Sequence, residues 1–274
     1  MKSPRPQGIS RTRRKRVLPW RRLALSFLLA ALCFLPGLGH CASKPCDPAK
    51  LVIAVDAGHG PKRSGAQSAR GVPEYAFNLA MAKRIVDELR QRGFAEASLI
   101  EEDGKDLSLA ERPARANARG ADVFLSVHHD SVQSQYLEKW EFQGKTSKYA
   151  DRFSGHSLFV SRKNARFEDS FDLAERMGQA LRDQGLSPTL HHAEKIKGEN
   201  RELLDKENGV YRYDGLRVLY DARMPAVLLE CGIIVNRDEE TALTDPERRS
   251  RIACAVADAI TAYCRDRAKA APSP

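Results

Sequence analysis

The amino-acid sequence predicts an α/β domain of three layers, α/β/α, built on a mostly parallel sheet of about six strands. Short apolar runs rich in β-branched residues alternate with longer segments whose apolar residues recur at helical spacing. Residues able to do chemistry follow directly after several of the apolar runs. Ligands bind at the carboxyl ends of the strands in such sheets, so this placement supports the same fold class.

The first half of the domain is expected to hold three strands and two helices. The first strand closes on a Gly-rich loop at Gly58, and the first helix stops at Gly93. Ser108 and Glu111 form the capping box of the second helix. In chain order, the expected elements are a strand at 51–55, a helix at 74–92, a strand at 97–100, a helix at 108–119 and a strand at 123–127.

The second half of the domain is less regular. Periodicity fails over residues 131–155, where aromatic and charged residues mix, so we expect a surface insertion there. Residues 190–213 are polar and charged and also lack a clean period. Asp245 and Pro246 open the last helix, because proline suits the first helical position. In chain order, the expected elements are a strand at 157–160, a helix at 171–184, strands at 216–219 and 226–229, and a helix at 245–264.

The N-terminus is expected to be an export signal peptide, residues 1–43, followed by one domain over 44–274. Nine Lys or Arg and no acidic residue precede an apolar run over 23–38, and small residues follow. This run is shorter than the roughly 20 residues of a membrane span, so no stable span is expected after cleavage; an uncleaved anchor is the alternative. Two twin-arginine pairs leave both the Sec and the Tat routes open. The protein is therefore expected to be periplasmic or secreted.

Charge and cysteine content add two expectations. The formal net charge is +9, but residues 1–40 contribute nine positive charges, so the remainder is near neutral and no nucleic-acid partner is expected. Cys46 and Cys264 lie near the two ends of the domain, and domain ends are often neighbours. Because export permits disulfides, we expect these two to pair; four unpaired thiols are the alternative.

Three residues have the chemistry of a catalytic zinc site. His59 follows the first strand, Glu74 starts the first helix, and His128 ends the third strand. Catalytic zinc often takes two histidines and one carboxylate and keeps a position open for water. Each residue also has a structural interpretation: a solvated loop histidine, or a glutamate that complements the helix dipole. His129 is adjacent, but strand alternation lets only one of the two histidines reach the metal.

Glu230 is the fourth candidate, because it ends the apolar strand at 226–229. A carboxylate there is costly unless it has a strong partner or a catalytic task. Beside a metal it would take a proton from water and deliver it to a leaving amine. A salt bridge to an arginine is the structural alternative.

Four motifs resemble those of the zinc-dependent N-acetylmuramoyl-L-alanine amidases of the AmiA/AmiB/AmiC type. They are Val-Asp-Ala-Gly-His-Gly at 55–60, Glu74 opening a helix, Ser-Val-His at 126–128, and Val-Leu-Leu-Glu-Cys-Gly at 227–232 with Asn236. The helix before the third strand, through Gly-Ala-Asp at 120–122, also looks like that family. The resemblance extends from about residue 51 to 263.

The resemblance implies that residues 44–274 are a zinc amidase catalytic domain. One Zn²⁺ would be held by His59, Glu74 and His128, and Glu230 would be the catalytic carboxylate. The substrate would be peptidoglycan, cut between N-acetylmuramic acid and L-alanine in wall remodelling or daughter-cell separation. Two alternatives stay open: a zinc peptidase or carboxypeptidase that acts within the stem peptide, and a binding protein without catalysis.

Departures from the family pattern mark candidate substrate or regulatory residues: His129, Asp130 and Cys231. His129 either contacts substrate or packs, and Cys231 is either a packing thiol or an added soft ligand. Some family members insert a helix that blocks the zinc until a protein activator displaces it. The segment 190–213 could play this part, and the alternative is a solvated surface. Its candidate ligands are His191, His192, Glu194, Glu199, Glu202 and Glu207.

Overall fold

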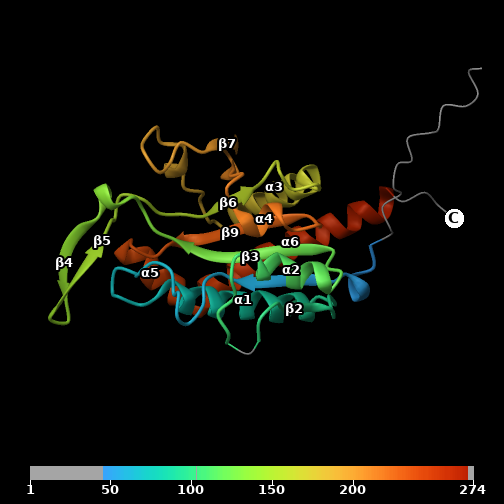
Figure 1. The fold of residues 1–274 in the computed structure, drawn as a ribbon, viewed down its shortest axis with the longest axis horizontal. Helices are drawn as coiled ribbons and strands as arrows, with labels where there is room; N and C mark the ends of the chain where they lie inside the picture. Colours follow the sequence, from blue (N-terminus) through green and yellow to red (C-terminus); the bar gives the residue numbers. More distant parts are fainter. Residues whose placement is uncertain (1–45, 103, 271–274) are drawn as a thin grey trace, which may run out of the picture. The chain divides into compact units, whose positions relative to one another are not determined.

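The computed structural model describes residues 46–102 and 104–270, and the expected signal peptide lies outside them. A seven-stranded sheet forms the centre, in the order β2-β1-β3-β9-β6-β8-β7 (Figure 1). Four of its six neighbouring pairs are parallel and two are antiparallel. The strands are β1 (Ile53–Ala57), β2 (Ala97–Leu99), β3 (Val123–Asp130), β6 (Ser157–Val160), β7 (Glu202–Asp205), β8 (Val210–Arg212) and β9 (Ala226–Ile233).

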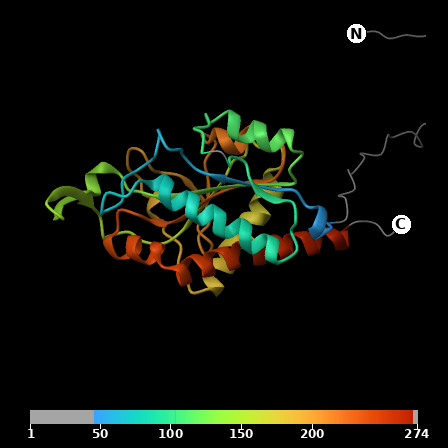
Figure 2. The same ribbon diagram turned by 90° about the horizontal axis from the view of Figure 1, so that it is seen from below.

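Helices cover both faces of the sheet, so the three-layer prediction is confirmed. Alternate residues of β1, β3 and β9 point to opposite faces, and each face has its own apolar core. Figure 2 shows the red α6 and the blue-green α1 on one side of the strands and the green α2 on the other. The helices are α1 (Glu74–Gln91), α2 (Glu111–Ala118), α3 (Phe167–Asp183), α4 (Arg217–Tyr220), α5 (Arg237–Thr244) and α6 (Pro246–Ala270).

The register of the parallel strands brings their carboxyl ends to one edge. Ala57 at the end of β1 pairs with Val127 in β3, and the next residue of β3, His128, pairs with Glu230 in β9. Neighbouring strands lie about 4.8 Å apart, so side chains that follow these positions fall within reach of one another. This edge positions the candidate site.

Two of our expectations for the second half of the chain are wrong. The predicted strand at 216–219 is the short helix α4, because Val218 and Leu219 pack side by side into the core on the α2 face. The polar segment 190–213 contains two short strands, β7 and β8, that extend the sheet to seven strands. β7 has four residues, none of them buried, and β8 has three residues, of which Val210 and Tyr211 are both buried, so neither strand shows a two-residue period.

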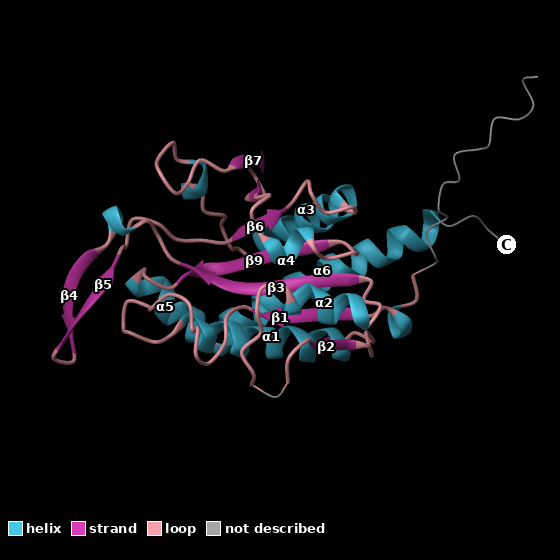
Figure 3. Cartoon of the chain, in the orientation of Figure 1, coloured by secondary structure: helices cyan, strands magenta, loops and turns pink. Residues whose placement is uncertain are grey.

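The predicted insertion at 131–155 contains a two-stranded hairpin, β4 (Glu138–Phe142) and β5 (Lys145–Tyr149). Gln143 and Gly144 both have positive φ, as a tight two-residue hairpin turn requires. Figure 3 shows the hairpin as a separate pair of magenta strands beyond the end of the main sheet. The hairpin is tied to the domain by the Trp140 indole, which donates a hydrogen bond of 2.9 Å to the Ala69 carbonyl.

The predicted disulfide between Cys46 and Cys264 is confirmed and joins the start of the domain to α6. Among the described residues, Cys231 and Cys254 remain free. The capping box of α2 is also present: Ser108 and Glu111 each donate a backbone N–H to the side chain of the other. Within residues 46–102 and 104–270, no helix combines the length and apolar character that a membrane crossing needs.

Candidate active site

His59, Glu74 and His128 meet at the edge where β1 and β3 end. The Nε2 atom of His59 lies 3.0 Å from Oε2 of Glu74, and Nδ1 of His128 lies 3.0 Å from Oε1 of the same carboxylate. The two imidazole rings are 5.0 Å apart and nearly perpendicular. Their ligand atoms are close enough together to hold one metal ion. The structure thus brings together the three predicted ligands, and His128, not His129, belongs to this group.

Glu74 is buried and held in place by groups outside the trio. The Ala66 backbone N–H donates to Oε2 at 3.1 Å, and the Asn78 amide donates to Oε1 at 3.0 Å. Burial would raise the pKa of Glu74, but hydrogen bonds with His128 and His59 hold this pKa well below its ordinary value. The carboxylate is therefore charged, as a metal ligand must be.

Two glycines make room for the cluster. A Cβ atom at Gly58 would overlap the imidazole of His128, and one at Gly65 would overlap Glu74 and His59. Gly65 also has a φ of +78°, which side chains rarely adopt. The backbone therefore approaches the three side chains as closely as it can, and this fits a metal cradle.

Arg112 clamps the loop that carries His59. Its guanidinium donates to Oδ1 of Asp56 at 2.5 Å and to the carbonyl oxygens of Ala57 and His59. The second oxygen of Asp56 accepts from the Ser126 hydroxyl at 2.7 Å. This buried network fixes a loop in which His59 itself has a φ of +67°. Such a strained conformation persists only where the surroundings enforce it.

Glu230 lies beside His128, its register partner in β3. Its Oε2 atom is buried and has no hydrogen-bond partner among the described residues. Burial raises the pKa of Glu230 well above its ordinary value, and the negative charges of Asp130 and Glu74 add to the effect. No arginine pairs with it in the described part of the chain, so the salt-bridge alternative finds no support.

His129 and Cys231 point away from the cluster, as strand alternation requires. The His129 ring packs against Phe77 of α1, and its Nδ1 lies 2.8 Å from the Asn78 side-chain oxygen. Burial lowers the pKa of His129 to about 3, so the ring is neutral. Cys231 is buried in the core below α1, and burial raises the pKa of its thiol. Both positions match the packing alternative.

Asp130 belongs to a separate group with His191 and His192. The histidines of the segment 190–213 therefore do not complete the cluster around Glu74. Its glutamates lie elsewhere too: Glu199 contacts His192, Glu194 contacts Tyr136 and Arg152, and Glu202 pairs with Arg212.

A pocket of about 310 Å³ opens beside His59 and His128. Its remaining walls combine apolar residues, three arginines and one carboxylate, contributed by Arg63, Asp106, Leu107, Leu109, Arg112, Gly215, Leu216, Arg217, Val218 and Leu228. This is the accessible face of the cluster, from which a substrate would approach.

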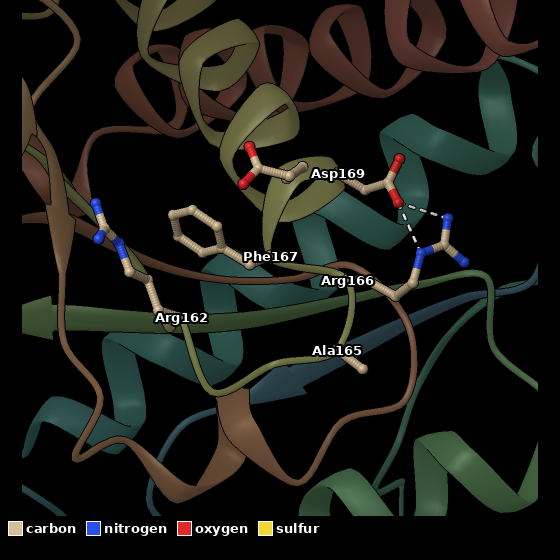
Figure 4. Close-up of a pocket in the computed structure, with 6 residues that line it drawn as sticks. Arg162, Ala165, Arg166, Phe167 and Asp169 are labelled. Atoms are coloured by element: carbon tan, nitrogen blue, oxygen red, sulfur yellow. Dashed lines mark hydrogen bonds and ion pairs between the residues drawn. The ribbon is translucent and has the colours of Figure 1, made fainter. Parts of the chain in front are cut away.

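A larger hollow, of about 580 Å³, surrounds the start of α3 (Figure 4). The strand β6 that leads into it runs antiparallel to β9, so the hollow lies at the opposite edge of the sheet. Figure 4 shows Arg166 turned toward Asp169, to which it is ion-paired, and the Phe167 ring nearby. Neither of the two candidate metal-binding groups among the described residues lies in this hollow.

Asn78 was not predicted as a site residue, yet it connects the helix that carries Glu74 with the ends of β1 and β3. Its amide donates to Glu74 and to the Gly58 carbonyl, and its oxygen faces His129. One signal was present: Asn78 follows Glu74 by four residues in a helix, which places both on one face.

Comparisons with known proteins agree with this geometry. The family model for N-acetylmuramoyl-L-alanine amidase matches residues 53–262. The amidase AmiA of Escherichia coli is 26% identical over 226 residues, covering 78% of this chain and 76% of that protein.

Two solved structures resemble this chain. The catalytic domain of the amidase CwlV from Paenibacillus polymyxa is 29% identical, with a TM-score of 0.58 over 78% of this chain and 97% of that one. The CwlD amidase of Clostridioides difficile, solved with the GerS lipoprotein, shares the fold at 23% identity and a TM-score of 0.58, over 78% of this chain and 98% of that one. With the family match over most of its length, this chain belongs to the N-acetylmuramoyl-L-alanine amidases and is a peptidoglycan amidase.

Proposed function

We propose that the amidase is zinc-dependent, with His59, Glu74 and His128 as the ligands of one Zn²⁺ and Glu230 as the catalytic carboxylate. The observation that carries the proposal is the meeting of two imidazole nitrogens with the two oxygens of a single carboxylate, each at 3.0 Å. Two histidines and one glutamate are a donor set of catalytic zinc sites. The glycine cradle around them supports the same assignment.

A bound zinc ion would supply Lewis-acid polarisation of the scissile carbonyl and would acidify a water molecule. The protein's own part is proton transfer. Glu230 accepts the proton of the attacking water and then delivers it to the amine of L-alanine as the amide bond breaks. The Oε2 atom of Glu230 has no hydrogen-bond partner among the described residues, so this oxygen is available to take up that proton between the two steps.

The pocket next to the cluster provides the binding surface for substrate. Its apolar walls include Leu107, Leu216 and Leu228, and Arg63 and Arg217 add positive charge. This combination suits a peptide that carries carboxylate groups, such as the stem peptide of peptidoglycan.

The proposal extends to the cell. Residues 1–43 would direct export, and residues 44–274 would act as the catalytic domain in the periplasm or outside the cell during wall remodelling. A protein activator remains part of the proposal, since the CwlD amidase was solved together with a lipoprotein.

Mass spectrometry of peptidoglycan digested with the zinc-loaded protein tests this function. We expect free stem peptides that begin at L-alanine, and we expect Glu230→Ala to release almost none. Shortened stems still attached to sugar would instead identify a peptidase. Equal release by Glu230→Ala and the unaltered protein would contradict the assigned role of Glu230.

A further inference from the structure

A second group of histidines and a carboxylate lies outside the proposed catalytic cluster. Asp130, the last residue of β3, faces His191 and His192 from the segment that precedes β7. Its Oδ2 atom lies 3.3 Å from Nε2 of His191 and 2.8 Å from Nε2 of His192. All three ligand atoms are close enough to share one metal ion, and both imidazoles are buried.

The two imidazoles are oriented in the same way by oxygen atoms behind them. Nδ1 of His191 lies 2.9 Å from the Thr189 hydroxyl, and Nδ1 of His192 lies 2.8 Å from a carboxylate oxygen of Glu199. Each Nε2 is thereby left to face Asp130. Histidines that bind metals show this arrangement, in which the second ring nitrogen is held by an oxygen and the first points to the metal.

Ion pairing without a metal explains only half of the group. A protonated His192 between Asp130 and Glu199 satisfies both of its nitrogens. Nε2 of His191, however, is buried and has no hydrogen-bond partner among the described residues, although the His191 side chain is only 1% exposed. An unsatisfied buried polar atom is costly, and it is rare in native proteins. A cation between the three donors would satisfy it.

We infer that Asp130, His191 and His192 bind a second divalent transition-metal ion, of which Zn²⁺ is the natural probe. Two imidazole nitrogens and one carboxylate oxygen suit zinc and its neighbours in the first transition row. The two imidazoles are buried, and none of the three residues is part of the wall of the pocket beside His59, so the ion would have a structural task. It would fasten the segment around residues 189–199 to the end of β3.

Metal counting in a variant that lacks the first cluster tests the inference. His59→Ala/His128→Ala removes two of the three proposed catalytic ligands and leaves the second group intact. After chelation and reloading with zinc, we expect elemental analysis to find about one tightly bound zinc ion per chain of this variant. Its melting temperature should also be higher than that of the metal-free form. Failure to retain any zinc would overturn the inference.

Two further variants locate the retained ion. Adding His191→Ala and His192→Ala to that background should abolish both the zinc and the thermal shift. Adding His156→Ala, another buried histidine outside both groups, should leave them. Equal zinc retention in the two would overturn the inference.

The variant that carries all four substitutions, at His59, His128, His191 and His192, can be tested only if it folds. If it does not fold, Co²⁺ bound to His59→Ala/His128→Ala gives the second measurement: its visible spectrum must show the absorption of cobalt with histidine ligands, and a featureless spectrum overturns the inference. None of these measurements depends on amidase activity, so failure here is distinct from failure of the proposed function.

Discussion

The two histidine–carboxylate groups of this amidase both use β3, yet they differ in access to solvent. In the first, the side chains of His59 and His128 are 33% and 17% exposed and line a pocket. In the second, those of His191 and His192 are 1% and 10% exposed, and their rings pack against aromatic neighbours. Catalytic metal sites need an open position and structural sites do not. This difference in access fits the catalytic role proposed for the first group and the structural role proposed for the second.

The largest expected effect separates the two groups directly. His59→Ala should lower amidase activity by about 1,000-fold or more, because a catalytic metal supplies several kcal/mol of transition-state stabilisation. In the metal-free protein, its folding stability should change by less than about 1 kcal/mol, since the side chain is partly exposed. His191→Ala should show the reverse balance: a loss of about 2 kcal/mol of stability and a smaller loss of activity. Activity assays and chemical denaturation of both variants measure this, and identical profiles would erase the distinction.

Glu230→Gln should lower kcat by about 100- to 10,000-fold, the range typical of a lost general acid–base group. The substitution keeps the shape of the side chain and removes only its proton-transfer capacity. Zinc content should therefore stay at the level of the unaltered protein. A variant that loses zinc in parallel with activity would identify Glu230 as a metal ligand instead.

The ion pair between Arg112 and Asp56, which holds the loop that carries His59, should stabilise the fold. Arg112→Met leaves the buried carboxylate of Asp56 without its partner, and we expect a loss of about 3–5 kcal/mol in the free energy of unfolding. Arg176→Met is the matched control, because Arg176 also pairs with aspartate, in its case Asp172 and Asp266, but at the surface. Its loss should be about 0–1 kcal/mol by denaturant titration. Equal losses would show that the clamp adds nothing beyond a surface ion pair.

His156 shows what burial does to an imidazole outside both groups. It is 2% exposed, and burial lowers its pKa from 6.5 to about 4. As pH falls from 6.5 to 4, the unfolded chain takes up a proton that the folded chain refuses, so stability decreases by about 3 kcal/mol over this range.

The substitution His156→Gln measures how much His156 contributes to the pH dependence of stability. His156→Gln cannot take up the proton, so its stability should decline less steeply between pH 6.5 and 4 than that of the unaltered protein. Denaturant midpoints across this pH range give the slope. Parallel curves would show that His156 is protonated in the folded state.

The parallel half of the fold could be predicted because its strands are buried on both faces. β1, β3 and β9 each begin with an apolar run, at 53–55, 123–125 and 226–229, and polar residues later in these strands mark the edge where the site forms. β7 and β8 could not be predicted, since they are short, no residue of β7 is buried, and the burial of Val210 and Tyr211 in β8 depends on tertiary neighbours. α4 was predicted as a strand because Val218 and Leu219 are adjacent apolar residues, and so short an apolar run does not distinguish a helix from a strand.

Within the site, too, residues marked by local sequence could be predicted, and residues that depend on tertiary contacts could not. His59, Glu74, His128 and Glu230 could be predicted, because element ends and family motifs mark them. The roles of Asn78 and Arg112 depend on contacts between segments about 20 and 55 residues apart, and no local pattern indicates those contacts. The association of Asp130 with His191 and His192 depends in the same way on how the segment before β7 folds back onto β3.

Anomalous X-ray scattering at the zinc edge, from crystals of the zinc-loaded protein, tests whether His59, Glu74 and His128 bind zinc. We expect a zinc peak between these three residues, within about 2.0–2.2 Å of one donor atom from each. Glu230 should lie beside that peak without coordinating it. Absence of zinc from this position, in protein that hydrolyses peptidoglycan, would contradict the account.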